Sequence, residues 1–177
     1  MDTAFRLDDV VRALAQTPAA LRGLVGGLSE AALNFHEAPD AWSPVQVICH
    51  MADGEIADWM PRVRIVMSET GNKTFAPFDR QAGFSRYANR PVGALLDEFD
   101  RLRAESLGAL ADLRLTSSDL GRQGIHPEFG AVTLEQLLAT WATHDFAHLA
   151  QISRSTVRYL GRHVGPWGRY FSLLRDR

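Results

Sequence analysis

The chain has 177 residues, of which 46% are hydrophobic and 23% charged, and this composition excludes collagen-like, mucin-like and disordered proteins. Its 19 basic and 21 acidic residues leave a formal net charge of −2, so we expect no general attraction to nucleic acid or to an anionic membrane surface. The single cysteine, Cys49, excludes an intrachain disulfide and a multi-thiolate zinc site. The length predicts one domain over residues 1–177.

The N-terminal segment, MDTAFRLDDVVRAL, is amphipathic and acidic. It lacks the basic start and the apolar run of a secretory signal. No uninterrupted apolar stretch reaches the roughly 18 residues of a candidate membrane span. These features predict a cytoplasmic protein with no membrane partner.

The first predicted helix follows from apolar residues at helical spacing between Phe5 and Leu28. Thr17-Pro18 lies inside this pattern. An internal proline loses a backbone hydrogen bond, so the helix should either kink there or restart with Thr17 as its N-cap. Residues 34–42 are expected to form a loop.

The second helix has a sharper start signal. Ser43-Pro44-Val45-Gln46 combines an N-cap serine, a proline at the first helical position and a glutamine that completes a capping box. The helix should run to about Ser68, with a kink at Pro61. Residues 69–90 contain glycine, proline and four aromatic residues and predict a long structured loop.

The third and fourth helices complete the fold. An apolar stripe from Val92 to Leu113 predicts the third helix, and residues 116–132 should form a second loop. The capping box Thr133-Leu134-Glu135-Gln136 begins the fourth helix, which should reach about Tyr159. No strand-like alternation is visible. Four long amphipathic helices predict an all-α antiparallel four-helix bundle with a long loop between helices 2 and 3.

Two of the six histidines, His144 and His148, lie four residues apart on the fourth helix. At this spacing the Cβ atoms are roughly 6 Å apart on one face, so two imidazoles can share a metal ion. Leu137 and Trp141 lie on the same face, so the pair should point inward or into a cleft. On the second helix, His50 lies on a small apolar face where an unpartnered imidazole would be costly. If the two helices are neighbours, His50 completes a three-imidazole site.

Two segments, WSPVQVICHMADGE (42–55) and HPEFGAVTLEQLLATWATHDFAHLAQISR (126–154), resemble the signatures of the DinB-like superfamily. The resemblance covers nearly the whole chain and implies a four-helix bundle that binds one divalent metal through His50, His144 and His148. It also implies a small-molecule substrate and a homodimer, to which the aromatic residues of the 69–90 loop and Trp167 could contribute unless they pack internally.

The sequence allows more than one metal ion and more than one type of reaction. Three imidazoles leave a coordination position free, as in catalytic sites, and we expect zinc first and nickel second. Characterised relatives include S-transferases and isomerases that use low-molecular-weight thiols, and others are called metal-dependent hydrolases. We therefore expect a metal-dependent enzyme that activates a thiol. The alternatives are a hydrolase that uses metal-bound water, a non-catalytic metal-binding stress-response module, and a bundle whose histidines bind no metal.

Three further residues are candidates for a role in catalysis. Gln151 lies on the ligand face and is expected to touch substrate or the metal-bound water. Asp53 is either an acceptor that orients an imidazole or a solvated surface acid. Asp145 either accepts from a neighbouring imidazole or faces a partner helix. Because no acidic residue lies squarely on either ligand face, a general base is missing, and this favours thiol transfer over hydrolysis.

We expect mainly structural roles for four other side chains. Glu55 should point outward, His126 should make a structural hydrogen bond, and Cys49 should be a small buried residue rather than a ligand. Arg103 falls within the apolar stripe of the third helix. It should therefore be buried against a carboxylate or carbonyls, unless it extends to water from the edge of the stripe.

Overall fold

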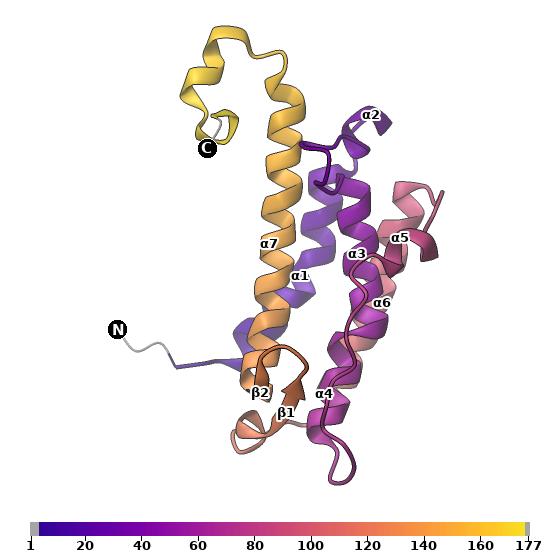
Figure 1. Ribbon diagram of the computed structural model, residues 1–177, viewed down its shortest axis with the longest axis vertical. Coiled ribbons are helices and arrows are strands. Elements are labelled where there is room, and N and C mark those ends of the chain that lie inside the picture. The colour runs from indigo at the N-terminus through magenta and orange to yellow at the C-terminus, as the bar shows by residue number, and fades with distance from the viewer. Residues whose placement is uncertain (1–3, 176–177) are drawn as a thin grey trace.

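The computed structural model describes residues 4–175 and shows a four-helix bundle (Figure 1). Its long elements are α1 (Leu7–Val25), α3 (Pro44–Ala57) continued by α4 (Trp59–Met67), α6 (Val92–Asp112) and α7 (Leu134–Gly161). Helix α1 packs on α6 and α7, and α3 packs on the same two helices. The predicted fold class is confirmed.

Both predicted capping boxes are present. The Gln46 side chain accepts from the Ser43 backbone N–H at 3.0 Å, and the Ser43 hydroxyl accepts from the Gln46 N–H. Thr133 and Gln136 make the same reciprocal pair at the start of α7. Each box satisfies backbone donors that the first helical turn leaves free. The starts of the two histidine-bearing helices are therefore fixed by local sequence.

Helix α1 runs without interruption through Pro18, so a restart at Thr17 is wrong. The Thr17 hydroxyl donates to the carbonyl of Ala13 at 3.2 Å instead of capping a new helix. Pro18 has no N–H to give to Leu14, the residue four positions earlier. The Leu14 carbonyl accepts instead from Arg103 on α6, at 2.8 Å. A side chain from another helix thus replaces the missing backbone bond.

The second predicted helix breaks at Asp58, and not at Pro61 as the sequence suggested. Asp58 has φ −116° and ψ −70°, and it separates α3 from α4. Pro61 is the third residue of α4, where a backbone N–H has no partner within the helix and its absence costs nothing. The break lies at the end of α3, and Trp59 directly after it packs on the rings of Trp141 and His144 of α7.

The connecting segments contain short elements that the sequence patterns did not predict. Helix α5 (Ala82–Arg86) lies within the 69–90 segment, and a hairpin of β1 (Gln123–His126) and β2 (Gly130–Thr133) lies within the 116–132 segment. The expectation of no strands is therefore wrong, because strands of four residues are too short to show alternation. The remaining short elements are α2 (Glu30–Leu33), η1 (Asp119–Gly121), η2 (Gly165–Tyr170) and η3 (Ser172–Leu174).

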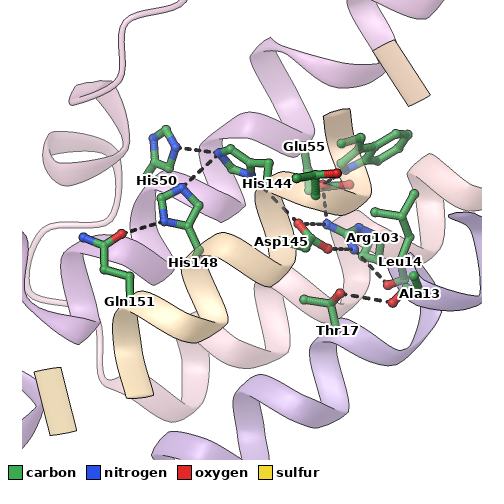
Figure 2. Close-up of polar contacts among 12 residues, drawn as sticks. Ala13, Leu14, Thr17, His50, Glu55, Arg103, His144, Asp145, His148 and Gln151 are labelled. Atoms are coloured by element: carbon green, nitrogen blue, oxygen red, sulfur yellow. Dashed lines mark hydrogen bonds and ion pairs between the residues drawn. The ribbon is translucent and has the colours of Figure 1, made fainter. Parts of the chain in front are cut away.

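The core consists of two apolar clusters separated by a polar layer. One cluster joins the second half of α1 to the first halves of α3 and α6, and the other joins the first half of α1 to α4 and the start of α7. Buried polar side chains from the middle of the bundle lie between them, including Glu55, Arg103 and Asp145. The histidines extend this layer toward the surface (Figure 2).

Candidate metal centre

The structure brings the three predicted histidines together (Figure 2). The Nε2 atom of His144 lies 2.9 Å from Nε2 of His50 and 3.0 Å from Nε2 of His148. One potential ligand atom from each ring lies within 4.8 Å of the other two. His50 and His148 are buried, and His144 is partly exposed. The three rings thus converge on one point at the edge of the polar layer.

The hydrogen bonds of the other ring nitrogens set the tautomers. His50 Nδ1 donates to the carbonyl of Arg80 at 3.1 Å, and His148 Nδ1 donates to the Gln151 side-chain oxygen at 2.9 Å. In a neutral imidazole one nitrogen carries the proton, so both Nε2 atoms present lone pairs. A proton on His144 Nε2 could satisfy one of these lone pairs but not both. A cation bound by all three nitrogens removes this conflict, so the residues fit a metal ion.

Burial favours the neutral form that binds metals. Loss of hydration and the neighbouring imidazoles lower the pKa of His50 to about 3. The same two causes, in the same order, lower the pKa of His148 to about 4. Both rings are therefore neutral near pH 7, as a metal ligand must be.

A pocket of about 410 Å³ opens beside His50 and His144. Beyond these histidines and Gly54, its wall comes from three places: the stretch of Asp58, Trp59 and Arg62, the segment 77–80, and the hairpin turn 126–129. This volume lies within the range of small-molecule sites. The pocket therefore gives a small ligand access to two of the three histidines.

The chain is similar over most of its length to proteins named for metal-dependent chemistry. The family model of the DinB superfamily matches residues 13–152. This chain belongs to the DinB superfamily. A protein of Oceanobacillus iheyensis named a putative metal-dependent hydrolase is 26% identical over 148 residues, which are 83% of this chain and 84% of that protein. The match confirms the resemblance carried by the two histidine-bearing segments.

A solved structure supports the fold of this DinB-superfamily chain. YfiT from Bacillus subtilis superposes with a TM-score of 0.75 and 22% identity, covering 91% of this chain and 92% of that one. It is described as a probable metal-dependent hydrolase with an unusual four-helix bundle topology. Within residues 4–175, no helix combines the length and the apolarity needed to cross a bilayer.

Asp58 is a pocket residue that the sequence interpretation missed. It lines the same wall as His50 and His144, and its Oδ1 atom lies 2.6 Å from Arg62 Nε. Burial raises the pKa of Asp58, and the nearby charge of Arg62 opposes that rise without cancelling it. Asp58 is eight residues after His50, about two helical turns, and this spacing was the available signal.

Asp145 faces a partner helix, which was one of its two expected roles. It makes a two-pronged contact with Arg103 of α6, at 2.6 and 3.1 Å. Arg103 also donates to Glu55 at 2.8 Å, and its side chain is 2% exposed, so its predicted burial against carboxylates is confirmed. The expected outward position of Glu55 is wrong, because Glu55 also accepts from Trp141 Nε1 at 3.0 Å inside the core.

The DinB fold gives Asp53 and Gln151 contacts that differ from those expected. Asp53 is buried and its Oδ1 lies 2.6 Å from Arg86 Nε of α5, so it is neither solvated nor hydrogen-bonded to an imidazole. Gln151 accepts from His148 Nδ1 and is absent from the pocket wall. The contact orients the ring of His148, and the expected contact of Gln151 with substrate or metal-bound water stays a prediction.

Cys49 and His126 lie where structural roles were expected. Cys49 is buried, and loss of hydration raises the pKa of its thiol to about 11, so it is protonated near neutral pH. His126 Nδ1 accepts from the backbone N–H groups of Glu128 and Phe129 and shapes the hairpin turn. Neither residue joins the three-histidine cluster.

Proposed function

We propose that this protein is a metal-dependent hydrolase of small molecules. His50, His144 and His148 hold one divalent ion, with zinc as the first candidate and nickel as the second. The observation that carries the proposal is Asp58, a buried carboxylate on the same pocket wall as His50 and His144. The hydrolase names of the Oceanobacillus iheyensis protein and of YfiT support the same class of reaction.

Two residues of the pocket wall serve the reaction, because Asp58 supplies a general base and Arg62 holds its carboxylate. When bound, a divalent metal acts as a Lewis acid that acidifies a coordinated water and polarises a substrate oxygen. Asp58 accepts the proton of the attacking water on a carboxylate oxygen. Its raised pKa makes it a stronger base than an ordinary aspartate, and Arg62 holds the carboxylate in place at 2.6 Å.

Asp58 alters the balance between hydrolysis and thiol transfer. The sequence favoured thiol transfer because no acidic residue lay squarely on a ligand face, so a general base was missing. Asp58 fills that gap from the break between α3 and α4. A wall with charged groups, including Glu128, also supports an enzyme over a sealed metal-binding module. We therefore place hydrolysis first and keep thiol transfer as an outcome of the assay.

The test uses zinc-loaded and nickel-loaded protein with small esters, amides and phosphoesters, each with and without a panel of low-molecular-weight thiols. We expect hydrolysis that needs the metal and no thiol. Asp58→Asn should lower kcat by about 10²- to 10⁴-fold while metal content stays unchanged, because it removes the base and spares the ligands. Asp112→Asn, at an exposed helix end, is the matched control. Conjugation that requires both metal and thiol would instead establish transfer.

A further inference from the structure

Among the described residues 4–175, Arg80 is the arginine of the pocket wall that makes no ion pair. The second arginine there, Arg62, is already paired with Asp58 at 2.6 Å. Within residues 4–175, the Arg80 guanidinium has no carboxylate at ion-pair distance and no hydrogen bond to another side chain. Its nearest aromatic contact is the ring of Trp42, whose centroid is 5.7 Å away.

Two contacts hold Arg80 beside the histidines. Its backbone carbonyl accepts from His50 Nδ1 at 3.1 Å. The Trp42 ring under its guanidinium lies 4.9 Å from the His50 ring and stacks on His148 at 6.3 Å. The same residue therefore orients one ligand through its backbone and places a positive charge next to two of them.

This positive charge opposes the proposed metal site. The Arg80 guanidinium and the rings of His50 and His148 all pack on Trp42, so its charge repels a further positive charge near these two rings. By the same Coulomb repulsion it weakens the binding of a divalent cation, although solvent screens part of this effect. A cation at this position therefore carries an electrostatic cost, which an anion in the pocket would offset.

We propose that Arg80 binds a carboxylate of the substrate, so that the substrate is a small molecule with a carboxylate group in addition to its hydrolysable bond. The inference rests on the proposed hydrolase function. A planar guanidinium suits two-pronged binding of a carboxylate. Trp59, Phe78 and Phe129 on the same wall can cover the apolar part of such a ligand. The volume of about 410 Å³ restricts the ligand to a small molecule.

Glu128 is the other charged group on the wall to consider, since it could favour a cationic ligand instead. It lies on the exposed hairpin turn. Within residues 4–175 its carboxylate makes no hydrogen bond or ion pair with the histidines, whereas Arg80 contacts His50 through its carbonyl and packs on Trp42 beside both His50 and His148. Of these two charged residues, Arg80 is the one held beside the histidines, and this favours an anionic ligand.

Binding of a matched pair of probes to the zinc-loaded protein tests the inference. The probes are succinic acid monohydroxamate and its methyl ester, which share a zinc-binding group and differ by one negative charge. In calorimetric titrations the acid should bind about tenfold more tightly than the ester, as expected for a partly exposed charged hydrogen bond. Arg80→Gln should reduce this ratio to near one. Arg90→Gln, which removes an arginine stacked on Tyr87 outside this pocket, should preserve it.

A second readout separates ligand binding from a structural role. Zinc affinity, measured by competition with a chromophoric chelator, should be unchanged or a few-fold higher in Arg80→Gln, because a repulsive charge is removed. A loss of zinc affinity would show that Arg80 only supports His50, and would overturn the inference. Equal binding of acid and ester to the wild type, or a ratio that depends on Glu128→Gln instead, would also overturn it. Both of these outcomes leave the proposed hydrolase intact. Failure of both probes to bind would contradict the metal site on which both proposals rest.

Discussion

His50, His144 and His148 present the same ring nitrogen to one point, although they come from two helices and have different neighbours. Arg80 and Gln151 fix the rings of His50 and His148 through hydrogen bonds to Nδ1. His144 Nδ1 lies 4.0 Å from Asp145 Oδ1, and its ring packs on Trp59 at 5.0 Å. Such contacts set ring orientation and ligand basicity. The donor set is therefore arranged before any metal binds.

Metal binding should depend on both helices. We expect His50→Ala and His148→Ala each to lower zinc affinity by at least about 100-fold, because the loss of a ligand costs more than the 10- to 100-fold effect of an outer contact. Zinc per chain, measured by mass spectrometry after dialysis, checks this. The control is His163→Ala, an exposed histidine outside the cluster. Full zinc occupancy in His50→Ala would contradict the three-histidine assignment.

The lowered pKa values predict how the metal-free protein responds to acid. Burial and the neighbouring imidazoles lower the pKa of His50 to about 3 and that of His148 to about 4 in the folded state, against an ordinary value of 6.5. Between these limits the unfolded chain binds more protons, so the free energy of unfolding falls as pH drops below about 6.5. Urea unfolding midpoints at several pH values measure this trend. In the double variant with His50→Gln and His148→Gln the slope should be shallower, and an unchanged slope would refute this origin.

At the scale of elements, α5 positions the pocket wall against α3. Gly83 makes this possible, because an added Cβ would lie 2.4 Å from the Cys49 carbonyl oxygen and 2.9 Å from Asp53 Cβ. The contact lies next to His50 on α3. It also brings Arg86 to Asp53, and the chain just before α5 supplies the Arg80 carbonyl. The close contact between α5 and α3 at Gly83 therefore helps to orient the ring of His50.

Gly83→Ala should therefore push α5 away from α3. We expect a loss of roughly 1–3 kcal/mol in the free energy of unfolding, typical of overpacking, together with weaker zinc binding. Urea denaturation and chelator competition measure the two effects. Gly108→Ala on α6 is the matched control, since nothing lies within 4 Å of its added Cβ and alanine should be neutral or stabilising there. Equal behaviour of the two variants would disprove the close-crossing argument.

At the scale of the whole molecule, Arg103 connects all four long helices. From α6 it donates to the Leu14 carbonyl on α1, to Glu55 on α3 and to Asp145 on α7. Its guanidinium also lies 4.9 Å from the Phe99 ring and 5.5 Å from the Trp141 ring. The network separates the two apolar clusters and adjoins the histidines. Because three of its partners are acceptors in the core, the arginine cannot be replaced by an apolar residue alone.

Arg103→Met should lower the free energy of unfolding by about 3–5 kcal/mol, because it leaves two carboxylates buried without their cation. Chemical denaturation measures this loss. The control is Arg101→Met, two residues earlier on α6 and on the opposite face of the helix. It removes an exposed arginine paired with Glu98 and Glu105 and should lower the free energy of unfolding by less than about 1 kcal/mol. Similar losses in both variants would contradict a structural role for the buried network.

The homodimer remains a prediction. The structure shows which of the aromatic residues expected at a dimer interface are exposed. Phe75 and Tyr87 of the 69–90 segment are buried, so these aromatic residues pack internally. Trp167 is 67% exposed and lies in η2, within the C-terminal segment that folds back beside α7 (Figure 1). We expect a homodimer by light scattering, weakened by Trp167→Ser. A mass near the chain mass of 19.6 kDa at high concentration would refute it.

Local sequence patterns predicted the class of fold, the starts of the main helices and the pairing of His144 with His148, and the resemblance to the DinB-like superfamily added His50. These features depend on local rules: helical spacing of apolar residues, capping boxes and the fixed geometry of an i, i+4 pair. Arg103 was also predictable, because a charge inside an apolar stripe requires a partner. Apart from the addition of His50, each of these inferences uses residues close together in the chain.

Which polar groups meet depends on packing between segments that are distant in the chain. Glu55 was expected to face outward because its angle was judged against His50 alone, and α6 and α7 proved to cover its side of α3. Asp58 enters the pocket because the helix breaks there, and Arg80 reaches His50 across 30 residues of sequence. Burial and charge depend on distant segments, so a pattern read along one helix cannot specify them.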